Sequence, residues 1–583
     1  MLKIIARRIN WVFLFSFFLG GSLLARLFFL QIISGGYYQS VASRQRNYSA
    51  VLEPRRGNIY FQNKSGELIT AAGTKEGYDI YINPRLLNET NADAEALYKK
   101  LEVIFPLKAD QPLAEKLDRE YFFNRLKRIN DPFEIIVKNV EEEKAVLVRD
   151  LKIDGVGLAP TEWRYYPAGK TASHVLGFLG YNGDQLEGRY GIEQYFEEVI
   201  KGKKGYIEGE KSAQGFLIDL GKKILNLPQE GQDVVLTINI DVQLFLEETL
   251  GKTRQKWRAK SAAGIIIEPR TGKVLAMASQ PDFDPNKYGE AEDLSVFVNP
   301  LVERIYEFGS VFKPLTMAAA LDKGVITPET KYYDRGYLIL NNRRIENYDG
   351  KGRGEVDMQK VLEESLNTGA VFAMQKLGKE NFYDYMQKYG FDFQTDIELP
   401  GEAVGNLSNL DTSRDIEYAT ASYGQGIAVS PLAVTRAFGV LANGGNLIKP
   451  YIVERIIKSG RLDYAAEPKL QSRAISEGTA ETISRMLVKV VDDALLGGTL
   501  KNPRYTIAAK TGTAFIPKKD SPGYSDESLH SFFGYAPGFD AKFLIFLFLE
   551  KPQEVRYASQ SLAESFMKIM DFLFDYYAVP PDR

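Results

Sequence analysis

The 583-residue sequence contains no cysteine and only two histidines, His174 and His530. Without cysteine the chain has no disulfide, no thiolate metal site and no thiol nucleophile. Two histidines are too few for a multi-histidine metal centre, and they leave a Ser-His-Asp triad only two possible bases. If the protein is an enzyme, its acid–base chemistry therefore falls to Lys, Asp, Glu, Ser or Tyr side chains.

The chain also lacks a strong net charge. Lys and Arg number 73 and Asp and Glu 76, which gives a formal charge of −3 and no global reason to expect a nucleic-acid partner. Hydrophobic residues make up 44% and charged residues 26% of the chain, as in a globular rather than a disordered protein. At roughly 150 residues per domain, the length predicts about three or four structural units.

One long apolar run, Val12–Ile33, lies near the N-terminus and follows the basic residues Lys3, Arg7 and Arg8. As a helix it would be about 33 Å long, which is enough to cross a bilayer. The basic residues before it predict a single-pass anchor with the N-terminus inside and the bulk of the chain outside the cytoplasm. A cleaved signal peptide is the competing interpretation, but the run is long for one and has no convincing small-x-small cleavage site.

Beyond this run the chain divides at 228–231, a Pro-Gln-Glu-Gly stretch typical of a hinge. The part before the hinge is rich in turn residues and mixes short strands with helical spacing at Ala94–Ile104. The part after it has strands at both ends, helices between them and an amphipathic last helix at Ser559–Tyr577. This order predicts an α+β fold with an antiparallel sheet covered by helices. The expected strands are Gly264–Glu268, Lys273–Ala278, Thr506–Lys510, Ser531–Ala536 and Phe543–Glu550.

Three short motifs in the second part carry the chemistry, and the first is Ser310-Val-Phe-Lys313. On a helix the serine and the lysine are at i and i+3 and therefore lie on one face. A lysine whose pKa is lowered from about 10.4 by burial or by a second cation can accept the serine proton, in place of a histidine. Alone the motif is weak, because this spacing arises by chance and an ordinary lysine would be solvated.

The second motif is Ser365-Leu-Asn367. Ser365 can relay a proton, and the amide of Asn367 can both donate to and accept from a substrate amide. Helix capping is the alternative explanation of this triplet.

The third motif, Lys510-Thr511-Gly512-Thr513, follows an apolar strand. Its cation and two hydroxyls suit an anionic substrate end, and Gly512 allows the backbone to approach closely. The N–H groups of Thr513 and Ser310 together would form an oxyanion hole. An ordinary Thr-Gly turn at the end of a strand is the alternative.

Together, S-x-x-K, S-x-N and K-T-G in this order are typical of penicillin-binding proteins and class A β-lactamases. Nearly the whole chain resembles a class B penicillin-binding protein, a membrane-anchored peptidoglycan D,D-transpeptidase, and is slightly more similar to the division-type subgroup. The further stretches that carry this resemblance are Arg26–Ile32, Pro54–Tyr60, Tyr165–Gly180, Arg189–Glu193, Ser422–Val434, Leu441–Gly445 and His530–Pro537.

The resemblance implies a domain organisation: a cytoplasmic tail at 1–11, a transmembrane helix at 12–33, an elongated mixed α/β pedestal domain of the dimerisation type at 34–230, and a transpeptidase domain at 231–578. It also implies location in the bacterial cytoplasmic membrane. Stem peptides of peptidoglycan are then the substrates and β-lactams the inhibitors. A membrane glycosyltransferase and other wall-assembly proteins are the expected partners, and neither a metal nor an organic cofactor is expected.

The same resemblance implies roles for the residues of the three motifs. Ser310, activated by Lys313, would attack the D-Ala–D-Ala bond of a stem peptide, and Ser365 would pass a proton to the leaving amine. Lys510 completes the expected catalytic group. Asn367, Thr511, Gly512 and Thr513 are the expected substrate-binding residues.

Other functions remain possible on the same motifs. A β-lactamase or D,D-carboxypeptidase would use water as the acceptor, and Glu402-Ala-Val-Gly-Asn406 matches the E-x-x-x-N pattern of class A β-lactamases. It follows Leu399-Pro-Gly, however, a loop that class B penicillin-binding proteins share. A non-catalytic scaffold for wall assembly is the other alternative. A β-lactam sensor is disfavoured by the short segment before the apolar run. Both histidines are expected to pack rather than to act as bases.

Overall fold

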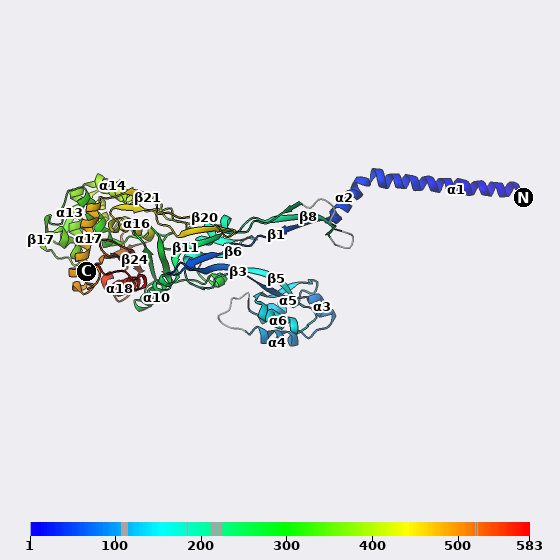
Figure 1. Ribbon diagram of the computed structural model, residues 1–583, viewed down its shortest axis with the longest axis horizontal. Coiled ribbons are helices and arrows are strands. Elements are labelled where there is room, and N and C mark those ends of the chain that lie inside the picture. The colour runs from blue at the N-terminus through cyan, green and yellow to red at the C-terminus, as the bar shows by residue number, and fades with distance from the viewer. Residues whose placement is uncertain are drawn as a thin grey trace. The chain divides into compact units, whose positions relative to one another are not determined.

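The computed structural model describes residues 2–106, 115–183, 185–211, 217–218, 224–518, 521 and 523–583. The chain forms two units, whose elements are labelled in Figure 1. The first unit combines Met1–Arg56 with Lys201–Gly231, and the second combines Gly57–Ile200 with Gln232–Arg583. Each unit is therefore built from two separate stretches of chain.

The first unit begins with a long helix, α1 (Leu2–Phe28), which continues through a π turn at Phe29–Ile33. The segment Lys3–Ile33 has a mean hydropathy of 1.9 over its most apolar window, and none of that window is buried among the described residues. Length and composition therefore fit a single-pass membrane anchor. The remaining elements are α2 (Gly35–Arg46) and a small antiparallel sheet of β1 (Asn47–Leu52), β8 (Gly205–Lys211), β9 (Leu217–Ile218) and β10 (Ile224–Asn226). The sequence predicts a hairpin region over Gly202–Gly205 and Gly215–Leu225, and part of the second stretch lies outside the described residues.

A seven-stranded sheet in the second unit joins both halves of the sequence. Its central strand, β11 (Asp233–Asn239), pairs in parallel with β2 (Ile59–Gln62) and antiparallel with β19 (Val453–Lys458). The sheet thus crosses the expected boundary between pedestal and transpeptidase domain, and those domain limits stay a prediction. The other strands are β3 (Leu68–Ile82), β4 (Glu134–Val140), β5 (Val156–Tyr165) and β20 (Arg461–Ala465).

Short helices pack on strands β3, β4 and β5 of this sheet and form a separate buried apolar cluster with them. Asp93 caps α4 through its carboxylate, which accepts hydrogen bonds from Glu95 N and Ala96 N at 3.0 Å. The helix spans Ala94–Ile104, as its apolar spacing predicts. The other elements before Ile200 are α3 (Pro84–Glu89), α5 (Arg119–Leu126), α6 (Glu142–Asp150), α7 (Ser173–Leu176), β6 (Phe178–Asn182), β7 (Gln185–Arg189), α8 (Gly191–Tyr195) and α9 (Glu197–Ile200).

The second sheet is antiparallel throughout, and its strand order is β13-β12-β24-β23-β22. The central strand β24 is buried along its whole length, because successive side chains point into two different cores. Phe546 and Phe548 face one core, while Ile545 and Leu547 face the other. The strands are β12 (Ser261–Ile267), β13 (Val274–Gln280), β22 (Ala508–Pro517), β23 (Tyr524–Ala536) and β24 (Phe543–Glu550).

Helices cover both faces of this sheet (Figure 1), which confirms the predicted fold class. On one face, α10 (Ile240–Lys256) and α18 (Ala558–Tyr577) pack together. On the other, α16 (Pro431–Ala442) stacks the ring of Phe438 on Phe533 with centroids 3.8 Å apart. The remaining elements are α11 (Lys313–Asp322), α12 (Met358–Glu363), α13 (Asn367–Leu377), α14 (Lys379–Lys388), α15 (Asp415–Ala421), α17 (Glu477–Lys489), β14 (Lys331–Asp334), β15 (Tyr337–Leu340), β16 (Arg343–Glu346), β17 (Gly354–Asp357), β18 (Asn446–Ile448) and β21 (Leu470–Arg473).

The sequence prediction was wrong about where β22 ends. The strand was expected to stop at Lys510, but it runs on to Pro517 and pairs Thr513 with His530. The two threonines are β-branched and alternate with buried neighbours, so the motif fits a strand. Gly512 is therefore not a turn residue.

Candidate active site

The serine of the first motif lies in a tight turn at the start of a buried helix. Gly309–Phe312 form a single 3₁₀ turn, and Lys313 then begins α11. Gly309 has a φ of +64°, and its N–H donates to Gly424 O at 3.0 Å. A side chain at Gly309 would also lie 3.0 Å from Thr513 O, so the turn packs directly on β22.

Two buried lysines meet at the hydroxyl of Ser365. Lys510 Nζ donates to Ser365 Oγ at 3.0 Å, and Lys313 Nζ donates to the same oxygen at 3.2 Å and also to Ser365 O. Both lysine side chains are almost completely buried. Neither amine has an ion-pair partner in the described part of the chain. Burying two amines around one hydroxyl therefore costs free energy.

Burial shifts the proton affinity of both amines. It lowers the pKa of Lys313 well below its ordinary range, and the positive charge of Lys510 lowers it further. Burial also lowers the pKa of Lys510, to about 8. Neutral Lys313 next to protonated Lys510 is therefore the arrangement that the site favours. No hydrogen bond joins Lys313 Nζ to Ser310 Oγ among the described residues, and such contacts often tighten only when substrate binds.

The second motif presents its two polar side chains from the beginning of α13. Ser365 has a φ of +53°, in the left-handed region that non-glycine residues rarely occupy. Asn367 is the first residue of α13, and its Nδ2 donates to Glu346 O at 2.7 Å. No described residue donates to the Oδ1 atom of this amide, which can accept a hydrogen bond from a ligand. Helix capping was the alternative role for this triplet, but Leu366 occupies the N-cap position and no side chain of the motif caps α13.

The third motif lies on β22, the edge strand of the sheet, and uses both of its faces. Lys510 extends on the face that holds the Ser310 turn. Thr511 and Thr513, two residues apart, share the other face. Thr513 Oγ1 accepts a hydrogen bond from Ala558 N at 3.1 Å, so its own hydrogen remains available to a ligand. A side chain on Gly512 would lie 2.5 Å from Phe308 O and 3.0 Å from Val311 N, and only glycine allows this approach.

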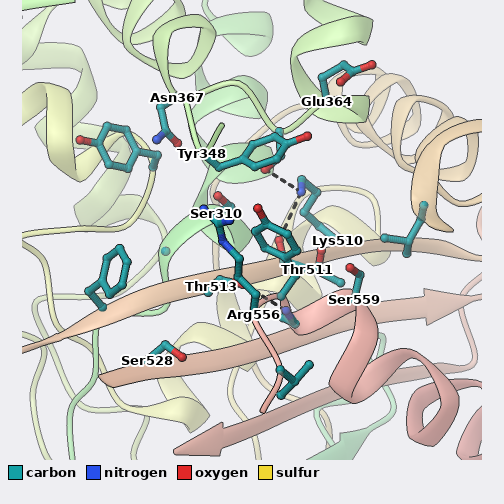
Figure 2. A pocket seen from close by; sticks show the side chains of 18 of the residues that line it. Ser310, Tyr348, Glu364, Asn367, Lys510, Thr511, Thr513, Ser528, Arg556 and Ser559 are labelled. Atoms are coloured by element: carbon teal, nitrogen blue, oxygen red, sulfur yellow. Dashed lines mark hydrogen bonds between the residues drawn. The ribbon is translucent and has the colours of Figure 1, made fainter. Parts of the chain in front are cut away.

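One cavity of about 870 Å³ joins the three motifs (Figure 2). Six of the eight site residues predicted from the sequence line it: Ser310, Ser365, Asn367, Lys510, Thr511 and Thr513. Lys313 lies behind Ser365, and Gly512 lies beneath the Ser310 turn. The structure therefore brings together residues that are as far apart in the sequence as Ser310 and Thr513.

Several residues that line the cavity were not predicted. Tyr348 and Tyr557 meet edge to face, with ring centroids 5.8 Å apart, and the guanidinium of Arg556 lies over the Tyr557 ring. Tyr348 and Arg556 are labelled in Figure 2. Both tyrosines come from loops without periodic spacing, and no sequence pattern marks them. Glu364 precedes the second motif directly, and its position next to Ser365 was the one clue available.

Both histidines and Glu402 lie outside the lining of this cavity. Neither histidine lines the cavity, and burial lowers the pKa of each to about 4. His174 Nε2 lies 2.9 Å from Val296 O, and His530 Nδ1 lies 2.8 Å from Ser561 Oγ. Glu402, the residue that a class A β-lactamase would require at the site, instead accepts hydrogen bonds from Thr395 N and Asp396 N.

Two family models match the chain. The penicillin-binding protein transpeptidase domain matches residues 262–571, and the penicillin-binding protein dimerisation domain matches residues 51–236. The chain belongs to the penicillin-binding proteins. The dimerisation domain followed by the transpeptidase domain confirms the predicted class B member of this family.

Curated penicillin-binding proteins and their relatives are similar over most of their length. Stage V sporulation protein D of Bacillus subtilis is 29% identical over 94% of this chain and 82% of its own. A peptidoglycan D,D-transpeptidase FtsI homolog of Mesostigma viride is 28% identical over 98% of this chain and 96% of its own. The probable peptidoglycan D,D-transpeptidase PenA of Neisseria gonorrhoeae is 26% identical over 99% and 94%.

Solved structures share the fold. Penicillin-binding protein 2X from Streptococcus thermophilus superimposes with a TM-score of 0.71 at 20% identity and covers 91% of this chain and 81% of its own. Penicillin-binding protein 3 from Mycobacterium tuberculosis, in complex with aztreonam, gives 0.68 at 22% identity and covers 92% and 98%. These structures support the predicted architecture of a pedestal and a transpeptidase domain.

Proposed function

We propose that this penicillin-binding protein is a serine-type peptidoglycan D,D-transpeptidase that cross-links stem peptides through an acyl-enzyme on Ser310. The observation that carries the proposal is the pair of buried amines, Lys313 and Lys510, on either side of the Ser365 hydroxyl. Ser310 lines the same cavity, and neutral Lys313 can act as its base, so no histidine is needed. The curated relatives named as D,D-transpeptidases support the same reaction.

In the first half-reaction neutral Lys313 takes the proton of Ser310 Oγ, which attacks the carbonyl carbon of the D-Ala–D-Ala bond. The resulting oxyanion accepts hydrogen bonds from the N–H groups of Ser310 and Thr513. The C–N bond then breaks, and the proton passes from Lys313 through Ser365 Oγ to the amine of the departing D-Ala. An ester between Ser310 and the stem peptide remains.

In the second half-reaction the amine of a neighbouring stem peptide attacks this ester. The proton of that amine returns to Ser310 Oγ through the same groups, and a peptide cross-link forms. A β-lactam imitates the donor, and its opened ring stays attached to Ser310 because no leaving group departs to make room for an acceptor.

Substrate recognition follows from the charges around Ser310. The terminal carboxylate of the donor fits the cation of Lys510 and the hydroxyls of Thr511 and Thr513, all of which line the cavity. The Oδ1 atom of Asn367 can accept a hydrogen bond from the donor's backbone amide. These groups hold both ends of the scissile bond over the nucleophile.

Hydrolysis is the second candidate, and the position of Glu402 does not favour the β-lactamase form of it. Its carboxylate is held by two backbone N–H groups and does not line the cavity, so it is not placed to activate water on the acyl-enzyme.

The cellular setting is also part of the proposal. The apolar N-terminal helix fits an anchor in the bacterial cytoplasmic membrane with the N-terminus inside. The transpeptidase domain is then extracytoplasmic, where peptidoglycan is assembled. A membrane glycosyltransferase that supplies uncross-linked glycan strands is the expected partner, together with other wall-assembly proteins.

The test is a cross-linking assay with purified full-length protein in detergent. A donor peptide that ends in D-Ala–D-Ala is mixed with an amine acceptor peptide, and products are separated by mass spectrometry. Transpeptidation predicts free D-Ala together with a donor–acceptor dimer. Release of D-Ala with only the hydrolysed donor as product would instead support the carboxypeptidase, and no release of D-Ala would refute both.

A further inference from the structure

A buried polar cluster lies directly behind the second motif and takes no part in the chemistry described above. It consists of Asp334 at the end of β14, Asn347 and Thr368, each with less than 5% of its surface exposed. Thr368 Oγ1 donates to Asp334 Oδ1 at 2.8 Å, and Asn347 Nδ2 lies 3.1 and 2.9 Å from the two carboxylate oxygens. The backbone N–H groups of Gly336 and Arg353 complete the shell at 2.9 and 3.0 Å.

This cluster replaces the missing N-terminal cap of α13. The N-cap residue Leu366 offers no side-chain acceptor, so the first N–H groups of the helix need partners from elsewhere. Asn347 Oδ1 accepts from Thr368 N at 3.3 Å, and the neighbouring Glu346 O accepts from Asn367 Nδ2 at 2.7 Å. The first turn of α13 is therefore fastened to residues 346–347, and Asp334 holds Asn347 in place.

The backbone conformation of Ser365 and the position of its hydroxyl depend on this attachment. It has a φ of +53°, and a non-glycine residue keeps such a conformation only where its surroundings impose it. Its Oγ must also stay within hydrogen-bond reach of both Lys313 and Lys510. A shift of the first turn of α13 by about 1 Å would break this arrangement and is enough to lower a rate about a hundredfold.

We propose that Asp334, Asn347 and Thr368 are positioning residues that hold Ser365 between the two lysines. This inference rests on the proposed function, because it assigns the cluster a part in the acylation of Ser310. The cluster touches neither substrate nor the reacting atoms, and it acts only through the place and conformation of Ser365.

The test compares two matched substitutions that each remove one buried hydroxyl and keep the side-chain shape. Thr368→Val removes the bond to Asp334. Thr253→Val is the control, since Thr253 is equally buried on α10 and donates to Thr249 O at 2.6 Å away from the cavity. The readout is the second-order rate constant for acylation by a fluorescent penicillin, with the melting temperature measured in parallel.

We expect Thr368→Val to lower the acylation rate constant about tenfold or more, while Thr253→Val changes it less than about twofold at a similar loss of melting temperature. Thr368→Ser keeps the hydroxyl and should restore most of the rate. In a Ser365→Ala background Thr368→Val should have almost no further effect, because the residue it positions is gone. A loss that is equally large in both backgrounds would overturn the proposal.

Two further outcomes are distinguishable. If the wild-type protein is not acylated at all, the proposed function fails; if it is acylated and Thr368→Val matches it, only the positioning role fails. Should Thr368→Val not fold, Tyr332→Phe carries the test, since it removes only the hydroxyl that lies 3.1 Å from Thr368 Oγ1. A rate loss of about threefold that vanishes in Ser365→Ala supports the proposal, and an unchanged rate contradicts it.

Discussion

The two buried lysines predict a bell-shaped pH dependence of acylation. Lys313 accepts a proton only when it is neutral, so the rate should rise as the pH passes its lowered pKa. Lys510 attracts the carboxylate only while it is protonated, and its pKa is about 8. At pH 9 only about a tenth of Lys510 keeps its proton, so above this pKa the acylation rate should fall about tenfold for each further pH unit.

Both amines share the Ser365 hydroxyl, so they titrate as a coupled pair. The rising and falling limbs of the pH profile therefore report apparent pKa values of the pair and not of either lysine alone. The assay is the second-order rate constant for acylation by a fluorescent penicillin across the range from about pH 5.5 to about pH 9.5. Circular dichroism at each pH controls for unfolding. Lys510→Arg keeps its charge at every pH, so a folded variant should lose the falling limb. A wild-type rate that still rises at the alkaline end would refute this account of the site.

Three other substitutions test the packing and the chemistry around Ser310. Gly512→Ala places a methyl group 2.5 Å from Phe308 O; we expect it to cost about 1–3 kcal/mol of unfolding free energy and to slow acylation, and normal acylation would contradict the packing. Glu402→Gln should leave the lifetime of the acyl-enzyme unchanged and cost about 1 kcal/mol of stability; a longer lifetime would restore the hydrolase. Phe438→Ala removes a ring stacked on Phe533 in the core and should lower the unfolding free energy by about 3–5 kcal/mol, as measured by chemical denaturation. A loss below about 1 kcal/mol would show that this stack is not part of the core.

Much of the fold follows from local sequence patterns. The hairpin of β12 and β13, the helix α4 and the last helix α18 each appear within a few residues of their predicted limits, because apolar periodicity and turn residues define them locally. The strand β22 was predicted to stop at Lys510, because a Thr-Gly pair is also typical of a turn. Gly512 instead lies within the strand and allows the close backbone approach that was expected of it, since the Ser310 turn packs on it. That contact joins segments about two hundred residues apart.

The composition of the site was predictable, but its geometry was not. The three motifs named the eight residues now found in or behind one cavity. The left-handed conformation of Ser365 and its external support by Asn347 could not be predicted, because they depend on tertiary contacts that leave no periodic pattern. The tyrosines that line the cavity from two loops escaped prediction for the same reason.

The central claim is that Ser310 is the nucleophile. The most direct measurement incubates the purified protein with a penicillin, digests it and locates the adduct by mass spectrometry. If Ser310 is the nucleophile, one stoichiometric adduct forms on Ser310, stable enough to survive the digestion, and none forms on Ser310→Ala. An adduct on any other residue, or equal labelling of Ser310→Ala, would contradict it.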